Sequence, residues 1–537
     1  MSNFIFITGG VVSSLGKGIT AASIGSILKH SGFKINIKKL DPYLNIDPGT
    51  MSPSQHGEVF ITKDGGETDL DLGYYERIAE IECSKNNNIT TGRLYEQLLK
   101  DERAGKYLGQ TVQIIPHVTD LIKNYILQDS DKFDFNIVEL GGTVGDMEIQ
   151  PFLEAIRQLR HNLGQQRTIF IHLTLVPYLK HSQEIKTKPT QHSFKELMKS
   201  GIVADVIVCR TEVSMPQKEK EKTAILCGLN PDAIFEAVDV ESVYLLQEKL
   251  YEQGIHKLIY KQTNTQGDSN AYENFLNGLK SKIEIQYNSK YLVKLAIVGK
   301  YTDSEDCYKS LIEAIKHAGI SNNTKVEIEW VNAREDFDLE KKDISAILVP
   351  GGFGTDGIEG KLKAIEYARK NDIPFLGICY GMQLAVIEYA RNVAGIKNAN
   401  TTEIDPSCEK LICLMNEWIN EDKVEIRTED SNIGGTMRLG EYEVELVKNS
   451  KIAKTYKSES IKERHRHRYV VNKEYVELIE KHGARFSGVG VFDGMPEVFE
   501  IENKRFFIGV QFHPEFNSLV QKPSPLFVEF IKSAIIS

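Results

Sequence analysis

Short apolar runs rich in β-branched residues recur along the first half of the chain, and longer stretches with helix-like spacing separate them. Most of these runs lack the apolar–polar alternation of a strand with one solvated face, as is typical of strands buried on both faces of a parallel sheet. We predict such strands at residues 4–8, 35–40, 135–140, 168–176 and 205–209. Strands that alternate with helices indicate an α/β domain.

The composition changes between residues 262 and 290, where the chain becomes polar and has few apolar anchors. We interpret this region as a linker with one helix around residues 272–279. A second α/β series follows, with strands predicted at residues 293–298, 326–330, 346–349 and 374–379. The predicted architecture is two doubly wound, mostly parallel α/β domains, residues 1–265 and 291–537, joined by a linker at residues 266–290.

Length, charge and cysteine content then exclude several classes of protein. The chain has 537 residues, more than one core usually holds at about 150 residues per domain. Its net charge of −10 argues against a general nucleic-acid-binding surface. No apolar run approaches the ~20 residues of a membrane span, and the apolar N-terminus is interpreted as a first strand. Seven cysteines without a Cys-x-x-Cys pair predict neither a disulfide framework nor a zinc site, so we expect a cytoplasmic protein.

A glycine-rich loop at residues 9–18 follows the first predicted strand and precedes a helical pattern. This arrangement predicts a phosphate site, because backbone amides and the helix N-terminus point at the anion and Lys17 reaches the terminal phosphates. The loop has one extra residue between its glycines, and Gly18 replaces the Ser or Thr that usually meets magnesium. The missing hydroxyl suggests that carboxylates hold Mg²⁺, with Asp71 and the strand-end Glu139 as candidates.

Residues 186–191 concentrate two lysines and several hydroxyl or amide donors on a proline-bent loop. Such a loop suits a triphosphate, although a solvated basic loop is the usual explanation of this kind of run. Lys222 lies in a charged helical stretch and by itself is interpreted as part of a solvated face.

The second half of the chain contains a candidate nucleophile. Cys379 stands in Gly-Ile-Cys-Tyr-Gly directly after an apolar run, and glycines there allow the sharp strand-to-helix turn that exposes a nucleophile. His513 follows the strand-like run at residues 506–512, and Glu515 is close enough to orient its ring. The glycines of residues 349–354 could supply backbone amides. Together these residues predict an activated thiol.

Six segments resemble signature segments of the CTP synthase family and occur in the family's order from the first strand almost to the C-terminus. They are residues 39–60, 67–73, 141–146, 186–191, 434–440 and 464–469. The resemblance implies a P-loop-like amidoligase domain followed by a class I glutamine amidotransferase domain. ATP would phosphorylate the oxygen at position 4 of UTP, and ammonia would displace the phosphate to give CTP.

The resemblance also implies residue roles in the first domain. The ATP-binding residues would be Ser14, Leu15, Gly16, Lys17, Gly18, Ile19, Asp71, Arg210, Val238, Asp239 and Val240. The residues that contact UTP and the feedback inhibitor CTP would be Ser13, Asp146, Met147, Glu148, Lys186, Thr187, Lys188, Pro189, Thr190, Gln191 and Lys222. Asp71 and Glu139 would hold Mg²⁺, and Lys17 and Lys39 would stabilise charge on the transferring phosphoryl group.

In the second domain, the resemblance implies that Cys379 forms a glutamyl thioester while His513 transfers protons and Glu515 holds the imidazole. The glutamine-binding residues would be Gly352, Tyr380, Gly381, Met382, Gln383, Glu403 and Arg468. GTP as an activator and a homotetramer that can form filaments are implied as well. The chain departs from the family at Tyr380, where Leu is usual, and at Asp356, where an Arg is usual in the loop associated with GTP activation.

Two other interpretations stay open at this point. A different amidotransferase-coupled ligase, such as one acting on a cofactor acid, would share Cys379, His513, Glu515 and the phosphate loop but would not need a triphosphate pocket at residues 186–191. A structural or regulatory protein could use the nucleotide loop to control self-assembly. However, such a protein would more readily have lost Cys379, His513 or Glu515, and all three are present.

Overall fold

The computed structural model describes residues 2–535 apart from 406, 415–416, 421–422 and 427–436. The chain packs into two compact units. The first unit comprises Met1–Pro48 and Asp71–Lys280, and the second comprises Gly49–Leu70 and Ser281–Ser537. The domain boundaries at residues 265 and 291 stay predictions. The structure differs from them in grouping residues 49–70 with the second unit. The helix expected around residues 272–279 is present as the longer α11 (Ser269–Tyr287).

A seven-stranded sheet with the order β11-β10-β7-β1-β6-β2-β5 forms the centre of the first unit, and all neighbouring pairs are parallel. Its strands are β1 (Asn3–Gly9), β2 (Ile35–Asp41), β5 (Asn88–Thr90), β6 (Phe135–Leu140), β7 (Thr168–Leu175), β10 (Val206–Thr211) and β11 (Ile234–Val238). The five strands predicted in this half of the chain are present, whereas the short β5 and β11 were not predicted.

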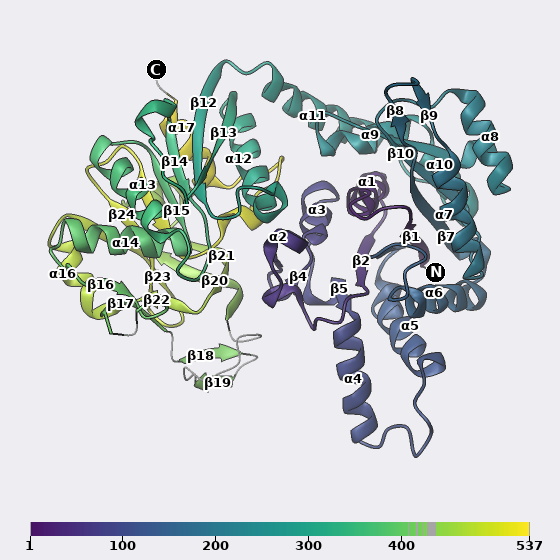
Figure 1. Ribbon diagram of the computed structural model, residues 1–537, viewed down its shortest axis with the longest axis horizontal. Coiled ribbons are helices and arrows are strands. Elements are labelled where there is room, and N and C mark those ends of the chain that lie inside the picture. The colour runs from purple at the N-terminus through teal and green to yellow at the C-terminus, as the bar shows by residue number, and fades with distance from the viewer. Residues whose placement is uncertain (1, 406, 415–416, 421–422, 427–436, 536–537) are drawn as a thin grey trace. The chain divides into compact units, whose positions relative to one another are not determined.

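Helices cover both faces of this sheet (Figure 1). The helices of this unit are α1 (Lys17–His30), α3 (Asp71–Ile78), α4 (Thr91–Arg103), α5 (Thr119–Leu127), α6 (Gln150–Leu163), α7 (Lys188–Lys199), α8 (Gln217–Cys227), α9 (Leu246–Glu252) and α10 (Ile255–Thr263), of which α4 extends away from the sheet. Phe4 and Phe6 of β1 pack with Phe152 of α6, while the alternate residues Ile5 and Ile7 are buried on the opposite face. Burial on both faces explains why the strand lacks polar alternation.

The second unit is built on a nine-stranded sheet with the order β13-β12-β14-β15-β25-β24-β23-β20-β21. The first five strands are parallel: β12 (Tyr291–Gly299), β13 (Thr324–Asn332), β14 (Ala346–Val349), β15 (Phe375–Ile378) and β25 (Phe507–Val510). The other four continue the sheet antiparallel: β20 (Arg438–Leu446), β21 (Ser460–His467), β23 (Ala484–Gly490) and β24 (Pro496–Ile501). The prediction of a mostly parallel sheet is therefore confirmed for the five strands from β13 to β25, whereas the four remaining strands are antiparallel.

Core clusters on the two faces of this sheet are covered by helices α12 (Lys309–Ser321), α13 (Ile358–Asn371), α14 (Tyr380–Asn392), α15 (Lys451–Tyr456), α16 (Val476–Glu480) and α17 (Pro525–Ala534). Short strands complete the unit: β16 (Ala399–Thr401), β17 (Glu409–Leu414), β18 (Glu417–Asn420), β19 (Lys423–Ile426) and β22 (Tyr469–Val471). Across the part of the chain that the structure describes, none of the helices has the length and apolar character that a membrane crossing requires.

Residues 49–70 contain α2 (Pro53–His56) and the two-stranded β3 (Phe60–Ile61) and β4 (Glu67–Thr68), and they pack against the second unit. Glu58 accepts hydrogen bonds from the backbone N–H of Ser310, at 2.8 Å, and from its hydroxyl. The buried Arg464 of β21 donates to the Ile61 carbonyl at 2.8 Å. Residues 49–70 are early in the sequence, but they thus pack against β21 of the second unit.

Candidate active site

Cys379 lies at the junction of β15 and α14, with a backbone φ of 52° and ψ of −102°. A positive φ is strained for a residue with a side chain, and such strain is common at functional positions. The flanking glycines make the turn possible, because a Cβ on Gly377 would lie 2.8 Å from the Gly381 backbone and a Cβ on Gly381 would lie 2.0 Å from the Val349 carbonyl oxygen. The turn therefore has the conformation predicted for a nucleophile elbow.

His513 and Glu515 lie just beyond the end of β25, which pairs with β15. Glu515 Oε1 is 2.7 Å from His513 Nδ1. A Cβ on Gly351 would be 3.0 Å from His513 Cε1 and 3.7 Å from Cys379 Cβ, so the two side chains converge beside this glycine. His513 Nε2 is buried and makes no hydrogen bond with the described residues, which leaves it available to the thiol or to a leaving group.

The electrostatics of this pair favour a protonated imidazole. Burial alone would lower the pKa of His513, but the charges of Glu515 and of Cys379 outweigh it and raise this pKa to about 10. A thiolate beside an imidazolium, with a carboxylate behind it, is the charge arrangement that an activated cysteine nucleophile needs.

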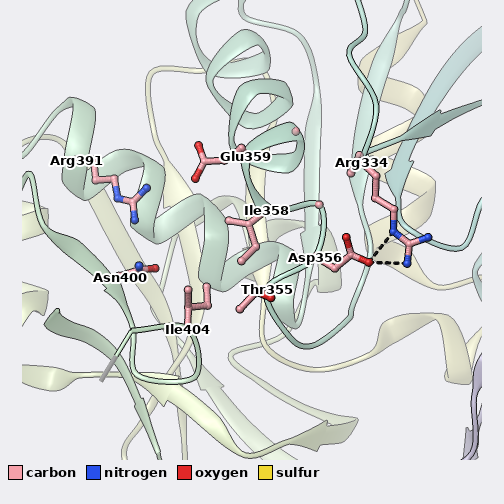
Figure 2. A pocket seen from close by; sticks show the side chains of 11 residues that line it. Arg334, Thr355, Asp356, Ile358, Glu359, Arg391, Asn400 and Ile404 are labelled. Atoms are coloured by element: carbon pink, nitrogen blue, oxygen red, sulfur yellow. Dashed lines mark hydrogen bonds and ion pairs between the residues drawn. The ribbon is translucent and has the colours of Figure 1, made fainter. Parts of the chain in front are cut away.

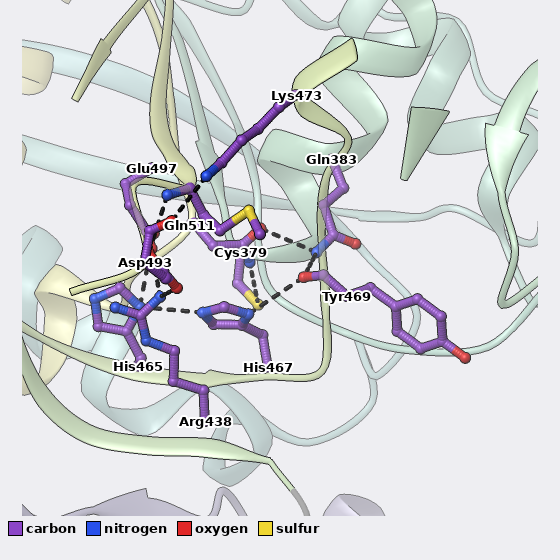
Figure 3. A network of polar contacts seen from close by, with 11 residues as sticks. Cys379, Gln383, Arg438, His465, His467, Tyr469, Lys473, Asp493, Glu497 and Gln511 are labelled. Atoms are coloured by element: carbon purple, nitrogen blue, oxygen red, sulfur yellow. Dashed lines mark hydrogen bonds and ion pairs between the residues drawn. The ribbon is translucent and has the colours of Figure 1, made fainter. Parts of the chain in front are cut away.

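The Cys379 sulfur has two further neighbours. It lies 3.6 Å from the Arg466 carbonyl oxygen and 3.5 Å from Gln511 Nε2. Figure 3 shows Gln511 and Gln383 next to the cysteine. Gln511 was not predicted as a site residue, although the sequence contained a signal: it is the one polar residue in the apolar run at residues 506–512. A polar side chain at the end of a buried strand needs a partner, and here the partners are another glutamine and the thiol.

The loop at residues 351–354, opposite the elbow, is fixed by side chains. Both backbone groups of Gly354 are bonded: Glu403 accepts from its N–H at 2.8 Å, and the Tyr380 hydroxyl donates to its carbonyl at 2.8 Å. Lys300 donates to the Phe353 carbonyl at 2.7 Å. Tyr380, predicted as a glutamine-binding residue, thus also holds this loop through its side-chain hydroxyl.

The other predicted glutamine-binding residues lie around the same elbow. Gly352 is in the fixed loop, Gly381, Met382 and Gln383 form the first turn of α14, and Arg468 follows β21. Burial raises the pKa of Glu403 and lowers that of Arg468. Of the signature segment at residues 434–440, residues 434–436 lie outside the described part of the chain.

A pocket of about 380 Å³ lies beside the loop that contains Asp356 (Figure 2). Arg334 and Asp356 point toward each other at one side of it and form an ion pair at 2.6 Å. Arg391, which also lines the pocket, donates to the Ala399 carbonyl at 2.7 Å. Asp356 therefore neutralises the charge of Arg334 at this side of the pocket.

A buried network near Cys379 links His465, His467, Glu497 and Arg438 (Figure 3). The three groups His465, His467 and Glu497 have the ligand types of a metal site. However, Arg438 donates to Glu497 at 2.9 Å, and the two histidine rings are 3.1 Å apart at their facing nitrogens, a hydrogen-bond distance. We therefore interpret this cluster as a polar network that supports β20, β21 and β24.

In the first unit, the phosphate loop connects β1 to α1. Gly16 has a φ of 92° and precedes Lys17, the first residue of α1, while Val11 has an unusual φ of 84°. Lys17 is buried and donates from Nζ to the Gly142 carbonyl at 2.8 Å, and burial lowers its pKa. A strained loop that ends at a helix N-terminus beside a buried lysine is suited to binding a phosphate chain.

Lys39, at the end of β2, lies between two carboxylates. It bonds to Asp71, the first residue of α3, and to Glu139 of β6 at 3.0 Å. Burial and the nearby Asp71 raise the pKa of Glu139 to about 7. A Cβ on Gly18 would lie 2.0 Å from Asp71 Oδ1, so the residue that replaces the usual hydroxyl leaves space that a carboxylate fills.

The remaining predicted nucleotide residues lie at the carboxyl ends of the parallel strands or in the helices that follow them. Ser13, Ser14, Leu15 and Ile19 belong to the phosphate loop and the start of α1, and Asp146, Met147 and Glu148 follow β6. Of residues 186–191, the last four form the first turn of α7 and the first two precede it. Arg210 of β10 pairs with Asp239 at 2.6 Å, next to Val238 and Val240 at the end of β11. Lys222 lies on α8, which packs on α7, and pairs with Glu219 at 3.2 Å.

Comparison with known proteins identifies the families that the two halves of the chain match. A family described as CTP synthase N-terminus matches residues 3–265, and glutamine amidotransferase class-I matches residues 304–533. The chain is 50% identical to a CTP synthase of Pelagibacter ubique (strain HTCC1062) over 99% of both chains. It is 48% identical to a CTP synthase of Rhodopseudomonas palustris (strain BisB5) over 100% of this chain and 99% of that one.

Among solved structures, the glutaminase domain of Trypanosoma brucei CTPS with bound acivicin is 36% identical, covers 45% of this chain and 93% of its own, and has a TM-score of 0.40. The fold and the two family matches define a glutamine amidotransferase joined to a nucleotide-binding α/β domain. The sequence similarity is more specific: the chain belongs to the CTP synthase family.

Proposed function

We propose that the protein is a ligase that aminates UTP to CTP, using ATP and the ammonia released from glutamine. The observation that carries the proposal is that a chain of this family contains both the Cys379–His513–Glu515 arrangement and the cluster of Lys17 and Lys39 with carboxylates at the end of a parallel sheet. A purely structural role would require neither.

In the glutamine half-reaction, the Cys379 sulfur attacks the side-chain amide carbon of glutamine. The carbon–nitrogen bond then breaks, His513 supplies the proton that lets ammonia leave, and a glutamyl thioester remains. Water hydrolyses the thioester to glutamate and restores the thiol. Backbone N–H groups of Gly352 and Tyr380 would stabilise the oxyanion that forms in each step. Gln383, Glu403 and Arg468 would hold the ends of the substrate.

In the synthase half-reaction, the γ-phosphoryl group passes from ATP to the oxygen at position 4 of UTP. This first step leaves ADP. Ammonia then attacks the ring carbon that carries the phosphorylated oxygen, and the bond between that carbon and the oxygen breaks, which releases phosphate and leaves CTP. Lys17 and Lys39 donate to the oxygens of the transferring group and stabilise its charge.

We propose Asp71 and Glu139 as the residues that would hold Mg²⁺, because two carboxylates beside a phosphate loop are the hard oxygen donors this ion prefers. When bound, the ion neutralises phosphate charge. The proposal extends to the ATP and UTP residues named above, to activation by GTP, to inhibition by CTP and to assembly into tetramers that can form filaments.

The two half-reactions can be tested separately. CTP formation is measured from UTP, ATP and Mg²⁺ with either glutamine or ammonium chloride as the nitrogen donor. Cys379→Ala should abolish the glutamine-dependent reaction and leave the ammonia-dependent rate within about twofold. A folded Cys379→Ala protein that has lost both reactions would contradict the division of labour between the two sites.

Lys17→Met tests the other site. It should stop CTP formation from both nitrogen donors while a basal glutaminase activity remains, because Lys17 acts on phosphate and not on glutamine. Lys38→Met is the matched control: Lys38 is also a buried lysine that donates to backbone carbonyls, those of Tyr125 and Gln128. Its loss should leave measurable CTP formation. Normal CTP synthesis by Lys17→Met would remove Lys17 from the mechanism.

A further inference from the structure

Two glutamine side chains beside Cys379 form a hydrogen-bonded chain whose direction is set by one backbone carbonyl (Figure 3). Gln383 Nε2 donates to the Tyr469 carbonyl oxygen at 2.9 Å, and a carbonyl oxygen can only accept. The same amide nitrogen has a second hydrogen, and Gln511 Oε1 lies 3.1 Å from it. The atom of Gln511 that faces Gln383 is therefore its oxygen, so its NH₂ group faces the opposite way.

The opposite side of Gln511 is occupied by the cysteine. Gln511 Nε2 lies 3.5 Å from Cys379 Sγ, and Gln511 is fully buried. The strand register produces this approach: Ile378 pairs with Val510, and the Cys379 N–H donates to the Val510 carbonyl at 2.7 Å. The Gln511 backbone N–H donates to the Glu497 carbonyl at 2.9 Å, which fixes the residue between β15 and β24.

We propose that Gln511 is a further catalytic residue of the glutamine-hydrolysing site, one that donates a hydrogen bond to the Cys379 thiolate and is held in the donating orientation by Gln383. The inference deepens the proposed function and rests on it. A neutral thiol can donate its proton to the Arg466 carbonyl at 3.6 Å, whereas a thiolate cannot. The thiolate instead accepts from Gln511 and faces His513, so the Gln511 bond selectively favours the ionised nucleophile.

The test compares Gln511→Glu and Gln511→Met in the full-length enzyme. Glu keeps the size of the side chain and places a carboxylate against the sulfur, while Met keeps the volume and removes the donor. The rate of iodoacetamide alkylation of Cys379 is followed against pH by mass spectrometry of the peptide that contains it. Glutamine hydrolysis, ammonia-dependent CTP formation and the melting temperature are measured on the same samples.

The pH at which Cys379 is half-maximally alkylated should rise by about one unit or more in Gln511→Glu and by less in Gln511→Met. The kcat for glutamine hydrolysis should fall about tenfold or more, with ammonia-dependent CTP formation within about twofold of the unaltered enzyme. Asn322→Asp is the matched control, since Asn322 is an amide of the same unit that donates to the carbonyls of Ala318 and Val528. It should leave the alkylation profile unchanged.

An alkylation profile that is unchanged in both Gln511 variants would overturn the inference. That result would not affect the proposed function, which is tested separately by CTP formation from glutamine and from ammonia in the unaltered enzyme and in Cys379→Ala. Should Gln511→Met fold poorly, as its melting temperature and ammonia-dependent activity would reveal, Gln511→Glu carries the test alone. An equal change in Asn322→Asp would assign the effect to general loosening of the unit and would also contradict the inference.

Discussion

The guanidinium of Arg466 lies 3.0 Å from the carboxylate of Glu67, and the backbone carbonyl of the same arginine lies 3.6 Å from the Cys379 sulfur. Arg466 also donates to the Gly49 carbonyl at 3.0 Å. The end of β21 is thus held by residues 49–70 on one side and contacts the nucleophile on the other. The position of the Arg466 carbonyl beside Cys379 therefore depends on residues 49–70, which are far from both in the sequence.

Glu67→Gln should therefore weaken glutamine hydrolysis. Glu67 is buried, and hydrogen bonds with a charged partner contribute about 1.5–3 kcal/mol, which corresponds to roughly a tenfold or greater loss in kcat/KM if the whole contribution acts on the site. The glutaminase half-reaction should be measured directly, without UTP. Glu502→Gln is the control, because Glu502 and Arg485 form an exposed pair of similar length, 2.9 Å, in the same unit. Equal behaviour of the two variants would show that the Glu67–Arg466 pair does not position β21.

Tyr380→Phe tests the hydroxyl that fixes the loop at residues 351–354. The variant keeps the ring and loses only the bond to the Gly354 carbonyl, so glutamine hydrolysis should fall about two- to tenfold, as expected for one hydrogen bond of about 0.5–1.5 kcal/mol. Tyr389→Phe is the matched control: Tyr389 is on the same helix and donates to the His482 carbonyl at 2.7 Å. A loss of similar size in both variants would indicate general destabilisation of α14.

The pH dependence of glutamine hydrolysis should report the ionised pair. With a His513 pKa of about 10, the imidazolium persists through neutral pH and is lost on the alkaline side, so the rate should decline as the pH rises toward that value. Glu515→Gln removes a negative charge that favours the imidazolium, and the alkaline decline should then move to lower pH. The measurement is the pH–rate profile of glutamine hydrolysis alone. An alkaline limb that does not move in Glu515→Gln would contradict the electrostatic role of Glu515.

Asp356 should limit the response to GTP. Asp356→Arg removes the partner of Arg334 and places a second cation beside the pocket of Figure 2, which favours a triphosphate. GTP should stimulate glutamine-dependent CTP formation more strongly in this variant than in the unaltered enzyme. Asp336→Arg, the same charge change at an exposed residue paired with Lys363, should not alter the response. An identical GTP response in the unaltered enzyme and in both variants would show that Asp356 does not limit activation by GTP.

Much of the fold could be predicted, because strands buried on both faces leave long apolar runs. The strands predicted at residues 135–140 and 346–349 have the bounds found in the structure. The antiparallel strands β20, β21, β23 and β24 were not predicted, since charged and aromatic residues interrupt their pattern and their partners are distant in sequence. The short β11 was missed as well.

The sequence by itself determined the chemistry of this protein: a cysteine at a glycine-flanked elbow, a His-Pro-Glu segment and a phosphate loop, each recognisable from neighbouring residues. Family membership follows from sequence similarity along the whole chain. Only the tertiary structure decided which side chains complete the sites. Gln511 contacts Cys379 because β25 lies beside β15. The Tyr380 hydroxyl contacts Gly354 because α14 begins beside the loop at residues 351–354. Arg466 contacts Glu67 because residues 49–70 pack on β21. Such contacts depend on strand order and packing between distant segments, which local pattern does not contain.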